Sequence, residues 1–508
     1  MAVYNFNRQD RLSVIFVMEE NLKNKAAKGA AWTFLGSTAN KGIQFVVSLL
    51  LARLLTPDDY GLIGMLGIFI GVSETLTDNG FTSALIQNKN RTNKDYSTAF
   101  YFNFGMSVLV YLALYLAAPF IADFYNQPLL KSIVRVYCLS ILIGAFTAVN
   151  SVQLTIALDY KTSNILSTSS ALASGLIGVI CAFMGMGVWS LVVQQLSMRF
   201  IQMILVFIKV KWFPDWVFSK QSFKQMFGFG SKLVVSGLIH NIYSNMYSIV
   251  IGKQFKPADL GYVSRAQGFN QMLAGNINGV ISSISFPVLS KIDGDERLMQ
   301  VYRKYIQMSA FLVFPLIMFL CGVAKPLILF LLTEKWATSI LLLQILSFSY
   351  IWDGIIQINL SLLYVKGRTD LVLRLEFIKK TIAFAILIIS VLIGNLVVFC
   401  IGMALYGNIA LFLNTIYTKK LLNYGFKKQM CDVLPYLFVS LFIMSIALFF
   451  SWLISNNLLS LVVSTVICIP TYFYICYRYR FYALSQVVEL ISPRTGRFGR
   501  WAKSKIIE

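Results

Sequence analysis

Long apolar runs, each interrupted by a short polar stretch, recur along the whole chain. A run of about eighteen or more uncharged apolar residues is typical of a membrane-spanning helix, because about 20 helical residues cross the hydrocarbon core. The pattern predicts an all-α polytopic membrane protein with about 14 transmembrane helices. The predicted spans are 29–54, 60–80, 97–121, 130–156, 164–184, 187–208, 226–252, 260–281, 304–332, 338–363, 372–393, 396–418, 433–454 and 457–477.

The loops between these spans are too short to fold as separate soluble domains. The composition agrees, since 57% of the 508 residues are apolar and 13% charged, whereas soluble chains average roughly half and a quarter. The predicted organisation is a cytoplasmic segment over 1–28, an N-lobe of six spans over 29–208, a cytoplasmic linker over 209–225, a C-lobe of six spans over 226–418, two further spans within 433–477, and a basic cytoplasmic tail over 478–508.

A sequence repeat relates the two predicted lobes. ARLLTPDDYG at 52–61 ends the first span and GKQFKPADLG at 252–261 ends the seventh, so a Pro-x-Asp-x-Gly pattern recurs at an offset of 200 residues. Six spans separate the copies, and an even number preserves their orientation in the membrane. The repeat therefore predicts two parallel six-helix repeats around a central cavity, followed by two C-terminal helices.

The net charge of +22 is large enough to suggest nucleic-acid binding. Most of the Lys and Arg residues, however, fall in alternate loops, including 87–96, 209–225 and 419–432, while the opposite loops contain only Lys253, Lys256 and Lys335. This asymmetry follows the positive-inside rule and predicts that both termini are cytoplasmic. The expected partners of these basic residues are anionic membrane lipids, and no nucleic-acid partner is expected.

Polar residues inside the predicted spans recur at steps of three and four, which places them on single helix faces. Such residues cost free energy in lipid, so we expect them to face a hydrated cavity between the lobes that binds the substrate. The stripes are Ser37, Lys41, Gln44 and Ser48 in the first span; Gly67, Gly71, Glu74 and Asp78 in the second; Gly237, Asn241, Ser244 and Ser248, with His240 adjacent, in the seventh; and Gln267, Gln271, Ala274 and Asn278 in the eighth.

The depth of a charge in its span indicates its importance. Lys41, His240 and Asp353 lie near the middle of their spans, where burial costs about 2.5–3.5 kcal/mol on an insertion scale. We therefore expect functional roles for them, although His240 could equally be a hydrogen-bonded packing residue. Arg53 and Arg265 lie nearer the outer ends, where they either bind substrate or anchor the helix at the interface.

Glu74 and Asp78 lie one turn apart in the inner half of the second span. Together with Asp353, they are candidates for coupling transport to a cation or proton. The alternative is that Glu74 and Asp78 form ion pairs with basic residues of the same lobe. Both interpretations follow from the cost of burying a carboxylate.

The sequence lacks the common motifs of nucleotide-binding proteins and metal-dependent enzymes. It contains neither GxxxxGK[ST] nor HExxH, and a single histidine with dispersed cysteines predicts no metal site. The loops cannot hold a nucleotide-binding domain. We therefore expect no catalytic residues, no cofactor and no enzymatic activity, and energy from a gradient, such as one of H+ or Na+, or from a partner.

Three motifs resemble a known family: ARLLTPDDYG at 52–61, a Gly-rich second span closing in DNGF at 78–81, and APFIADFY at 118–125. The chain resembles the polysaccharide transporter family, the Wzx-type oligosaccharide flippases of the multidrug, oligosaccharidyl-lipid and polysaccharide exporter superfamily. The resemblance implies two six-helix lobes forming a V-shaped cavity and alternating access driven by an ion gradient. The implied substrate is an undecaprenyl pyrophosphate-linked oligosaccharide, flipped across the bacterial inner membrane for O-antigen, capsule or exopolysaccharide export.

In such flippases cationic cavity residues meet the pyrophosphate and acidic sugars. By position, the resemblance assigns this role to Lys41, Arg53, His240 and Arg265, with Gln44 and Asn241 from the polar stripes as further substrate-binding candidates. It implies a lipid-linked oligosaccharide as partner, together with a polysaccharide polymerase and glycosyltransferases. The alternatives are a cation-coupled multidrug exporter, a lipid II flippase of the same superfamily, and a membrane polysaccharide polymerase or ligase. The last is disfavoured by the short outward loops.

Overall fold

The computed structural model describes residues 36–78 and 80–491. These residues form helices joined by short connections, with no strand among them. The chain divides into two compact units between Lys253 and Gln254. The predicted N-terminal segment 1–28 lies outside the described residues, as does the predicted tail from residue 492 onward.

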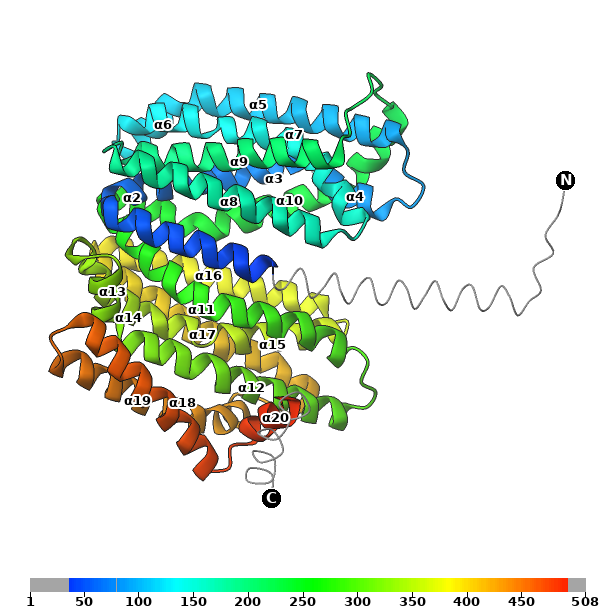
Figure 1. The fold of residues 1–508 in the computed structure, drawn as a ribbon. Coiled ribbons are helices and arrows are strands. Elements are labelled where there is room, and N and C mark those ends of the chain that lie inside the picture. The colour runs from blue at the N-terminus through cyan, green and yellow to red at the C-terminus, as the bar shows by residue number, and fades with distance from the viewer. Residues whose placement is uncertain (1–35, 79, 492–508) are drawn as a thin grey trace, which may run out of the picture. The chain divides into compact units, whose positions relative to one another are not determined.

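The first unit is a bundle of antiparallel helices in which α8 packs on α9, α9 on α7 and α7 on α5 (Figure 1). The contact between α8 and α9 is close, since a Cβ added to Gly178 would lie 2.9 Å from the Gln194 side chain. The helices of this unit are a first helix over residues 36–54, α2 (Pro57–Met65), α3 (Gly67–Asp78), α4 (Phe81–Gln87), α5 (Asn93–Tyr125), α6 (Leu129–Tyr137), α7 (Leu139–Ile156), α8 (Tyr160–Phe183), α9 (Val188–Val210) and α10 (Lys220–Gln254).

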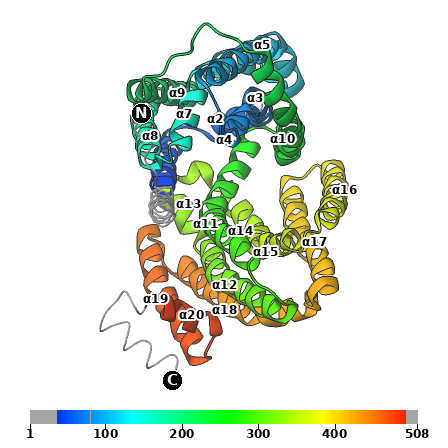
Figure 2. The ribbon, with the colours of Figure 1, turned by 90° about the vertical axis from the view of Figure 1, so that its right-hand side faces the viewer.

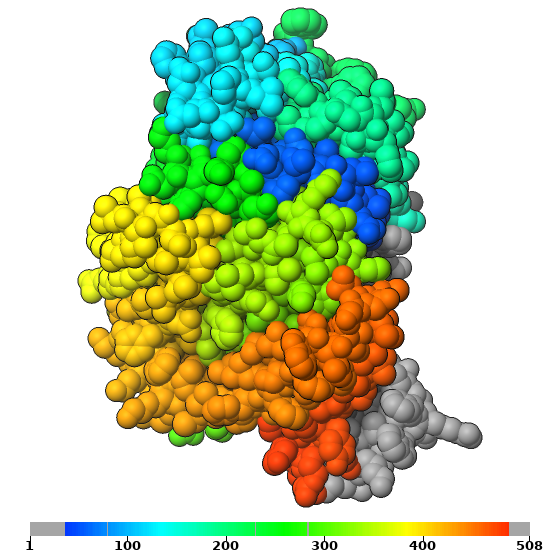
Figure 3. Space-filling view, turned by 90° about the vertical axis from the view of Figure 1, so that its left-hand side faces the viewer, coloured from blue at the N-terminus to red at the C-terminus, as the bar shows by residue number. Residues whose placement is uncertain are grey.

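The second unit has its apolar core along α12, which packs on α18 and α15. Figure 2 shows α16 paired with α17, and Figure 3 shows the orange surface of α19 beside the yellow-green surface of α13 and α14. Its helices are α11 (Pro257–Leu289), α12 (Asp295–Gly322), α13 (Ala324–Leu331), the 3-10 turn η1 (Glu334–Trp336), α14 (Thr338–Tyr350), α15 (Asp353–Val365), α16 (Thr369–Ile393), α17 (Leu396–Leu422), α18 (Phe426–Leu453), α19 (Asn457–Arg478) and α20 (Tyr482–Ile491).

The repeated Pro-x-Asp-x-Gly pattern builds the same helix start in both units. Pro57 and Pro257 are the first residues of α2 and α11, where a missing N–H is tolerated. Two residues on, Asp59 accepts the backbone N–H of Thr56 at 2.9 Å, and Asp259 accepts that of Lys256 at 3.1 Å. The repeat therefore encodes a capped helix entry after a preceding helix.

The described helices confirm the all-α membrane class. Eleven helices or runs of two or three consecutive helices in the described part of the chain are long and apolar enough to span a membrane. Large apolar side chains stand on the outside of these helices, as at Phe120, which is 75% exposed, and Leu392, which is 80% exposed. Such surfaces suit lipid. The predicted total of 14 spans stays a prediction.

The predicted lobe boundary at 209–225 and the division between the two compact units fall at different places in the chain. The seventh predicted span corresponds to α10, which belongs to the first unit because the division falls after Lys253. The predicted linker at 209–225 and the predicted lobes on either side of it stay predictions about the repeat.

Candidate functional site

The first helix carries a polar stripe where it packs on α8. Asn40 Nδ2 donates to Ser167 Oγ of α8 at 3.2 Å, and Gln44 Nε2 donates to Asn40 Oδ1 at 2.9 Å. One turn earlier, a Cβ on Gly36 would lie 2.4 Å from Asn164. The small residue and the hydrogen bonds therefore hold the helix close to α8.

Three of the predicted substrate-binding residues lie on the exposed surface of this helix. Lys41 and Gln44 are exposed side by side, and Arg53 is exposed near the C-terminal end. Exposed cationic and amide side chains can reach a ligand without rearrangement of the helix. Their role in substrate binding stays a prediction.

The stripes of the second and seventh predicted spans contact each other. Asn241 Nδ2 on α10 donates to Thr75 Oγ1 on α3 at 2.6 Å. A Cβ on Gly71 would lie 2.5 Å from Asn241 Oδ1, and one on Gly237 would lie 2.7 Å from Thr75 Cγ2. Asn241 therefore has a helix-packing role in this structure, and substrate binding by Asn241 stays a prediction.

His240 precedes Asn241 on α10 but is exposed. Its Nε2 lies 3.5 Å from Ser244 Oγ, one turn further along the same helix. Such a local contact leaves the imidazole accessible. The functional role of His240 and its alternative as a hydrogen-bonded packing residue both stay predictions.

Glu74 on α3 forms an ion pair with Arg199 on α9, with Arg199 Nη2 2.5 Å from Glu74 Oε1. The Arg199 side chain is 34% exposed and that of Glu74 53%. Asp78, one turn further along α3, is also exposed. The ion-pair alternative for Glu74 is thus present in the structure, while coupling roles for Glu74 and Asp78 stay predictions.

Arg199 is a residue that the sequence-based site omitted. It is the single charged residue in the central part of α9. A carboxylate predicted inside one span requires a cation on a neighbouring helix, and this requirement could have identified Arg199. Its distance from Glu74 of 125 positions in sequence hid the pairing.

Arg265 lies in the second unit, on α11, against an aromatic cluster. Its guanidinium carbon is 6.0 Å from the ring centroid of the fully buried Trp336. Tyr262 contacts Trp336 edge-on, with ring centroids 6.1 Å apart, and its carbonyl accepts the Ser339 hydroxyl at 3.1 Å. The cation–π contact supports an anchoring role, and substrate binding by Arg265 stays a prediction.

Asp353 lies at a break in the tenth predicted span. α14 ends at Tyr350 and α15 begins at Asp353, so this span consists of two consecutive helices. Trp352 holds the break by donating its Nε1 to Asn408 Oδ1 on α17 at 2.9 Å. A carboxylate at a helix N-terminus is stabilised by the helix dipole, and broken helices supply ion sites in transporters.

The candidates are distributed over helices of both units. In the first unit the first helix carries Lys41, Gln44 and Arg53, α10 carries His240 and Asn241, and α3 carries Glu74 and Asp78; in the second unit α11 carries Arg265 and α15 carries Asp353. The predicted central cavity between lobes stays a prediction. Across residues 36–78 and 80–491, no group of three or more His, Cys, Asp or Glu side chains is arranged to hold a metal ion.

A buried polar network in the second unit is absent from the sequence-based site. Tyr302 OH on α12 donates to Asn359 Oδ1 on α15, and Asn359 Nδ2 donates to Gln429 Oε1 on α18 at 3.3 Å. Gln429 Nε2 in turn donates to Thr418 Oγ1 on α17 at 3.1 Å. All four side chains are fully buried. The network therefore joins four helices at one level of the unit.

A carboxylate extends this network. Asp432 accepts hydrogen bonds from both Nε and Nη2 of Arg303, and its Oδ2 also accepts Tyr424 OH at 2.5 Å. These contacts of Asp432 could not be predicted from the sequence, because polar residues near the ends of spans are common. Only the packing of α12, α17 and α18 brings them together.

A comparison with known families assigns the chain. The model of a family described as "Polysaccharide biosynthesis protein" matches residues 50–341, which is more than half of the chain. The chain belongs to this family. The polysaccharide transporter family predicted from the sequence motifs is thereby confirmed.

Relatives of this family member cover most of its length. The teichuronic acid biosynthesis protein TuaB of Bacillus subtilis is 28% identical over 69% of the chain and 73% of that protein. The lipopolysaccharide biosynthesis protein WzxC of Escherichia coli is 23% identical over 78% of the chain and 80% of that protein. Both relatives are thus bacterial proteins named for biosynthesis, one of teichuronic acid and one of lipopolysaccharide.

Solved structures share the fold. The lipid II flippase MurJ in an inward closed conformation superposes with a TM-score of 0.72 at 13% identity, covering 87% of this chain and 99% of MurJ. An inward-facing multidrug transporter of the MATE family and MOP superfamily gives 0.56 at 15% identity, over 75% and 95%. The predicted fold class, apart from the number of spans, is confirmed.

Proposed function

We propose that this chain is a flippase that moves an undecaprenyl pyrophosphate-linked oligosaccharide across the bacterial inner membrane, for O-antigen, capsule or exopolysaccharide export. The observation that carries the proposal is the family match over residues 50–341 on a fold shared with a lipid flippase. One relative is the succinoglycan biosynthesis transport protein ExoT from Rhizobium meliloti. It is 24% identical over 63% of the chain and 65% of that protein. The family name refers to polysaccharide biosynthesis and the name of this relative to transport, and together they support a transported polysaccharide precursor.

Substrate recognition rests on cations in the first unit. A pyrophosphate carries concentrated negative charge, and charge-assisted hydrogen bonds from ammonium and guanidinium groups offset its desolvation. Lys41, Arg53 and His240 are exposed on the first helix and α10. These side chains meet the diphosphate, while the neighbouring Gln44 hydrogen-bonds to sugar hydroxyls. Arg265, on α11 of the second unit, is a further cationic candidate for substrate binding.

Energy coupling rests on the carboxylates. Protonation of Glu74, or cation binding by Glu74 and Asp78, competes with Arg199 for the Glu74 carboxylate and so changes the contact between α3 and α9. In the second unit Asp353 stands at the break between α14 and α15, where a helix can bend. An H+ or Na+ gradient thus drives alternating access without a bound cofactor.

The topology follows the distribution of basic residues. Both termini and the loops at 87–96, 209–225 and 419–432 are cytoplasmic in this proposal. A cysteine introduced at Lys220, an exposed residue at the start of α10, should resist an impermeant thiol reagent in intact cells with a permeabilised outer membrane. Labelling from outside would invert the assignment.

The experiment that tests the function is translocation of a lipid-linked oligosaccharide by the purified protein in liposomes. Transport should require an ion gradient and should saturate with substrate. Lipid II and a cationic drug are tested in parallel, because the fold is shared with a lipid II flippase and with a multidrug transporter. Faster translocation of either one than of the lipid-linked oligosaccharide would replace the proposed substrate class.

A further inference from the structure

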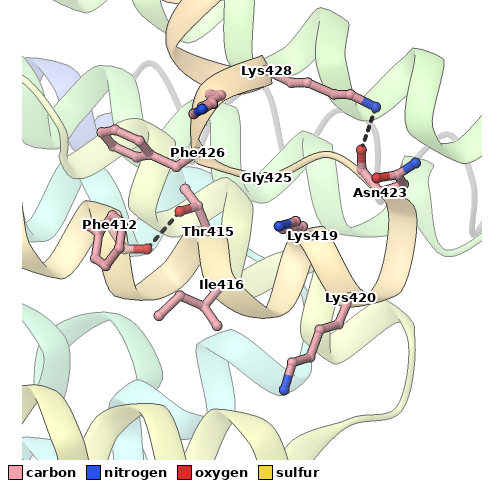
Figure 4. Close-up of a pocket in the computed structure, with 10 residues that line it drawn as sticks. Phe412, Thr415, Ile416, Lys419, Lys420, Asn423, Gly425, Phe426 and Lys428 are labelled. Atoms are coloured by element: carbon pink, nitrogen blue, oxygen red, sulfur yellow. Dashed lines mark hydrogen bonds between the residues drawn. The ribbon is translucent and has the colours of Figure 1, made fainter.

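The turn between α17 and α18 forms a cavity of about 700 Å³ whose rim is basic (Figure 4). Lys419 and Lys420 come from the end of α17, and Lys427 and Lys428 from the start of α18. All four are exposed. None of the predicted substrate or coupling residues lines this cavity.

The backbone of the turn is fixed by a helix cap and by a glycine. Asn423 ends α17 with φ of 52°, and its N–H donates to the Lys419 carbonyl at 3.0 Å. Gly425 is the N-cap residue of α18, and a Cβ there would lie 2.8 Å from the Lys419 side chain, so the position favours glycine. The cavity is therefore shaped by local chain geometry.

The buried network behind the turn holds it in place. The Tyr424 carbonyl accepts hydrogen bonds from Thr418 Oγ1 at 3.0 Å and from Gln429 Nε2 at 3.2 Å. Both side chains are fully buried. Since protein groups satisfy the inner side of the turn, its outer side is preformed for a ligand.

The positive charge of the rim is not balanced within the described part of the chain. None of the ion pairs among the described residues includes a lysine of this rim. The carboxylate nearest in sequence, Asp432, is bonded to Arg303 and Tyr424. The first turn of α18 has no acidic residue and no side-chain cap, so the helix dipole adds to the positive potential.

The wall of the same cavity is apolar. Phe412 and Ile416 project from α17 and are 49% and 39% exposed, and Phe426 contacts Phe412 edge-on with centroids 5.4 Å apart. In a helix of a membrane protein, exposed apolar side chains face acyl chains. Basic rim and apolar wall together match one amphiphile with an anionic head.

We propose that the α17–α18 turn binds an anionic phospholipid of the surrounding bilayer. Its phosphate lies among Lys419, Lys420, Lys427 and Lys428, and one acyl chain follows Phe412 and Ile416. The predicted cytoplasmic side of this turn is the side where basic residues meet anionic headgroups. A free phosphate would use the rim but not the apolar wall. This inference goes beyond the proposed function and does not depend on it.

Native mass spectrometry of the delipidated full chain in neutral detergent tests the proposal. Phosphatidylglycerol should bind as one saturable adduct at least about tenfold more tightly than phosphatidylcholine with the same acyl chains. The quadruple Lys→Gln variant at 419, 420, 427 and 428 should bind both lipids equally weakly. A matched variant at the exposed residues Lys209, Lys211, Lys220 and Lys224, also on the predicted inward side, should keep the wild-type preference.

Thermal unfolding provides the second measurement. Phosphatidylglycerol should raise the melting temperature of the wild type and of the matched variant, because a ligand of the folded state stabilises it. The pocket variant should melt at the wild-type temperature without lipid and show no rise with it. Melting checks that each variant is folded, so loss of binding cannot be loss of structure.

Several outcomes would overturn the proposal. They are equal binding of the two lipids, equal loss in both quadruple variants, and retention of the phosphatidylglycerol preference in the pocket variant. Competition by inorganic phosphate at millimolar concentration would make this a site for free phosphate. Displacement by an equimolar polyprenyl diphosphate would assign the cavity to a transported lipid. None of these measurements requires transport, so failure here is distinct from failure of the proposed flippase activity.

Discussion

The polar side chains described above differ in burial between the two units. In the second unit Tyr302, Asn359 and Gln429 are fully buried and bonded to one another. In the first unit Lys41, His240 and the Glu74–Arg199 pair lie on exposed helix surfaces. A buried and satisfied network stabilises one arrangement of helices, whereas a ligand or an ion can reach charges at an exposed surface. Burial thus separates polar residues that hold the fold from candidates for transport.

The largest expected effect is on the stability of the second unit. Asp432→Ala removes the acceptor of Arg303 and Tyr424 and should lower the free energy of unfolding by about 2–3 kcal/mol. This is below the usual figure for a buried pair because Arg303 is half exposed. Thermal unfolding in detergent measures the change.

The matched control is Asp370→Ala, which removes an ion pair with Arg368 on the same unit in which both side chains are about half exposed. The hydrogen bond from Arg368 lowers the pKa of Asp370 to about 2, so this carboxylate is ionised throughout the neutral range. Its removal should leave the melting temperature unchanged. Lost transport in Asp432→Ala at wild-type stability would contradict a structural role for the network.

The next effect is on the affinity of the first unit for its substrate. Lys41→Gln removes the ammonium and should cost about 1.5–3 kcal/mol of a charge-assisted contact with pyrophosphate, a loss of roughly ten- to hundredfold in affinity. Folding should change little because Lys41 is exposed. Translocation of the lipid-linked oligosaccharide in liposomes gives the measurement.

Two further variants sharpen this test. Lys41→Arg should restore part of the activity, because guanidinium binds phosphate with a different geometry. Lys89→Gln, at an exposed position in a predicted cytoplasmic loop, should transport at the wild-type rate. Equal activity in all variants would remove Lys41 from substrate recognition and leave His240, Arg53 and Arg265 as candidates.

A smaller effect is expected where α3 meets α10. Gly71→Ala places a Cβ 2.5 Å from Asn241 Oδ1, and displacing that side chain should cost about 1 kcal/mol. Gly42→Ala is the control, since a Cβ there has no neighbour within 4 Å and alanine favours the helix. Unfolding curves of the two variants should therefore shift in opposite directions. A stable Gly71→Ala protein would show that the glycine stripe is not needed for packing.

The smallest stability effect concerns the Glu74–Arg199 pair. Because both side chains are partly exposed, Glu74→Gln should change the free energy of unfolding by less than about 1 kcal/mol. If Glu74 couples transport to a cation or proton, gradient-driven flipping should nevertheless be abolished, and Asp78→Asn should act in the same way. Unchanged transport in both single variants, at matched protein level, would limit Glu74 to its ion pair with Arg199.

The sequence predicted much of the fold because its information is periodic. Apolar runs of bilayer length predicted the membrane class, and helices occupy the described parts of the predicted ranges. The recurrence of Pro57 and Asp59 at Pro257 and Asp259 located two equivalent helix starts. What it could not predict was the break between α14 and α15 beside Asp353, because the flanking segments are equally apolar.

For the candidate site, the sequence could predict only which polar residues in the spans would cost free energy in lipid. Polar steps of three and four identified Lys41, Glu74 and Asn241, since helix periodicity is local. Their partners are not local: Asn241 bonds Thr75 across 166 positions, and Glu74 bonds Arg199 across 125.

The sequence by itself therefore determined that this is a helical membrane protein with a repeated motif, and it predicted a basic inward face and intramembrane charges, because each of these depends on residue type and spacing alone. Only the tertiary structure decided that Gly71 accommodates Asn241, that Gln429 joins four helices, and that four lysines surround an apolar cavity at one turn. Those features depend on which helix faces meet, and that choice is made by packing many weak contacts together rather than by any local pattern.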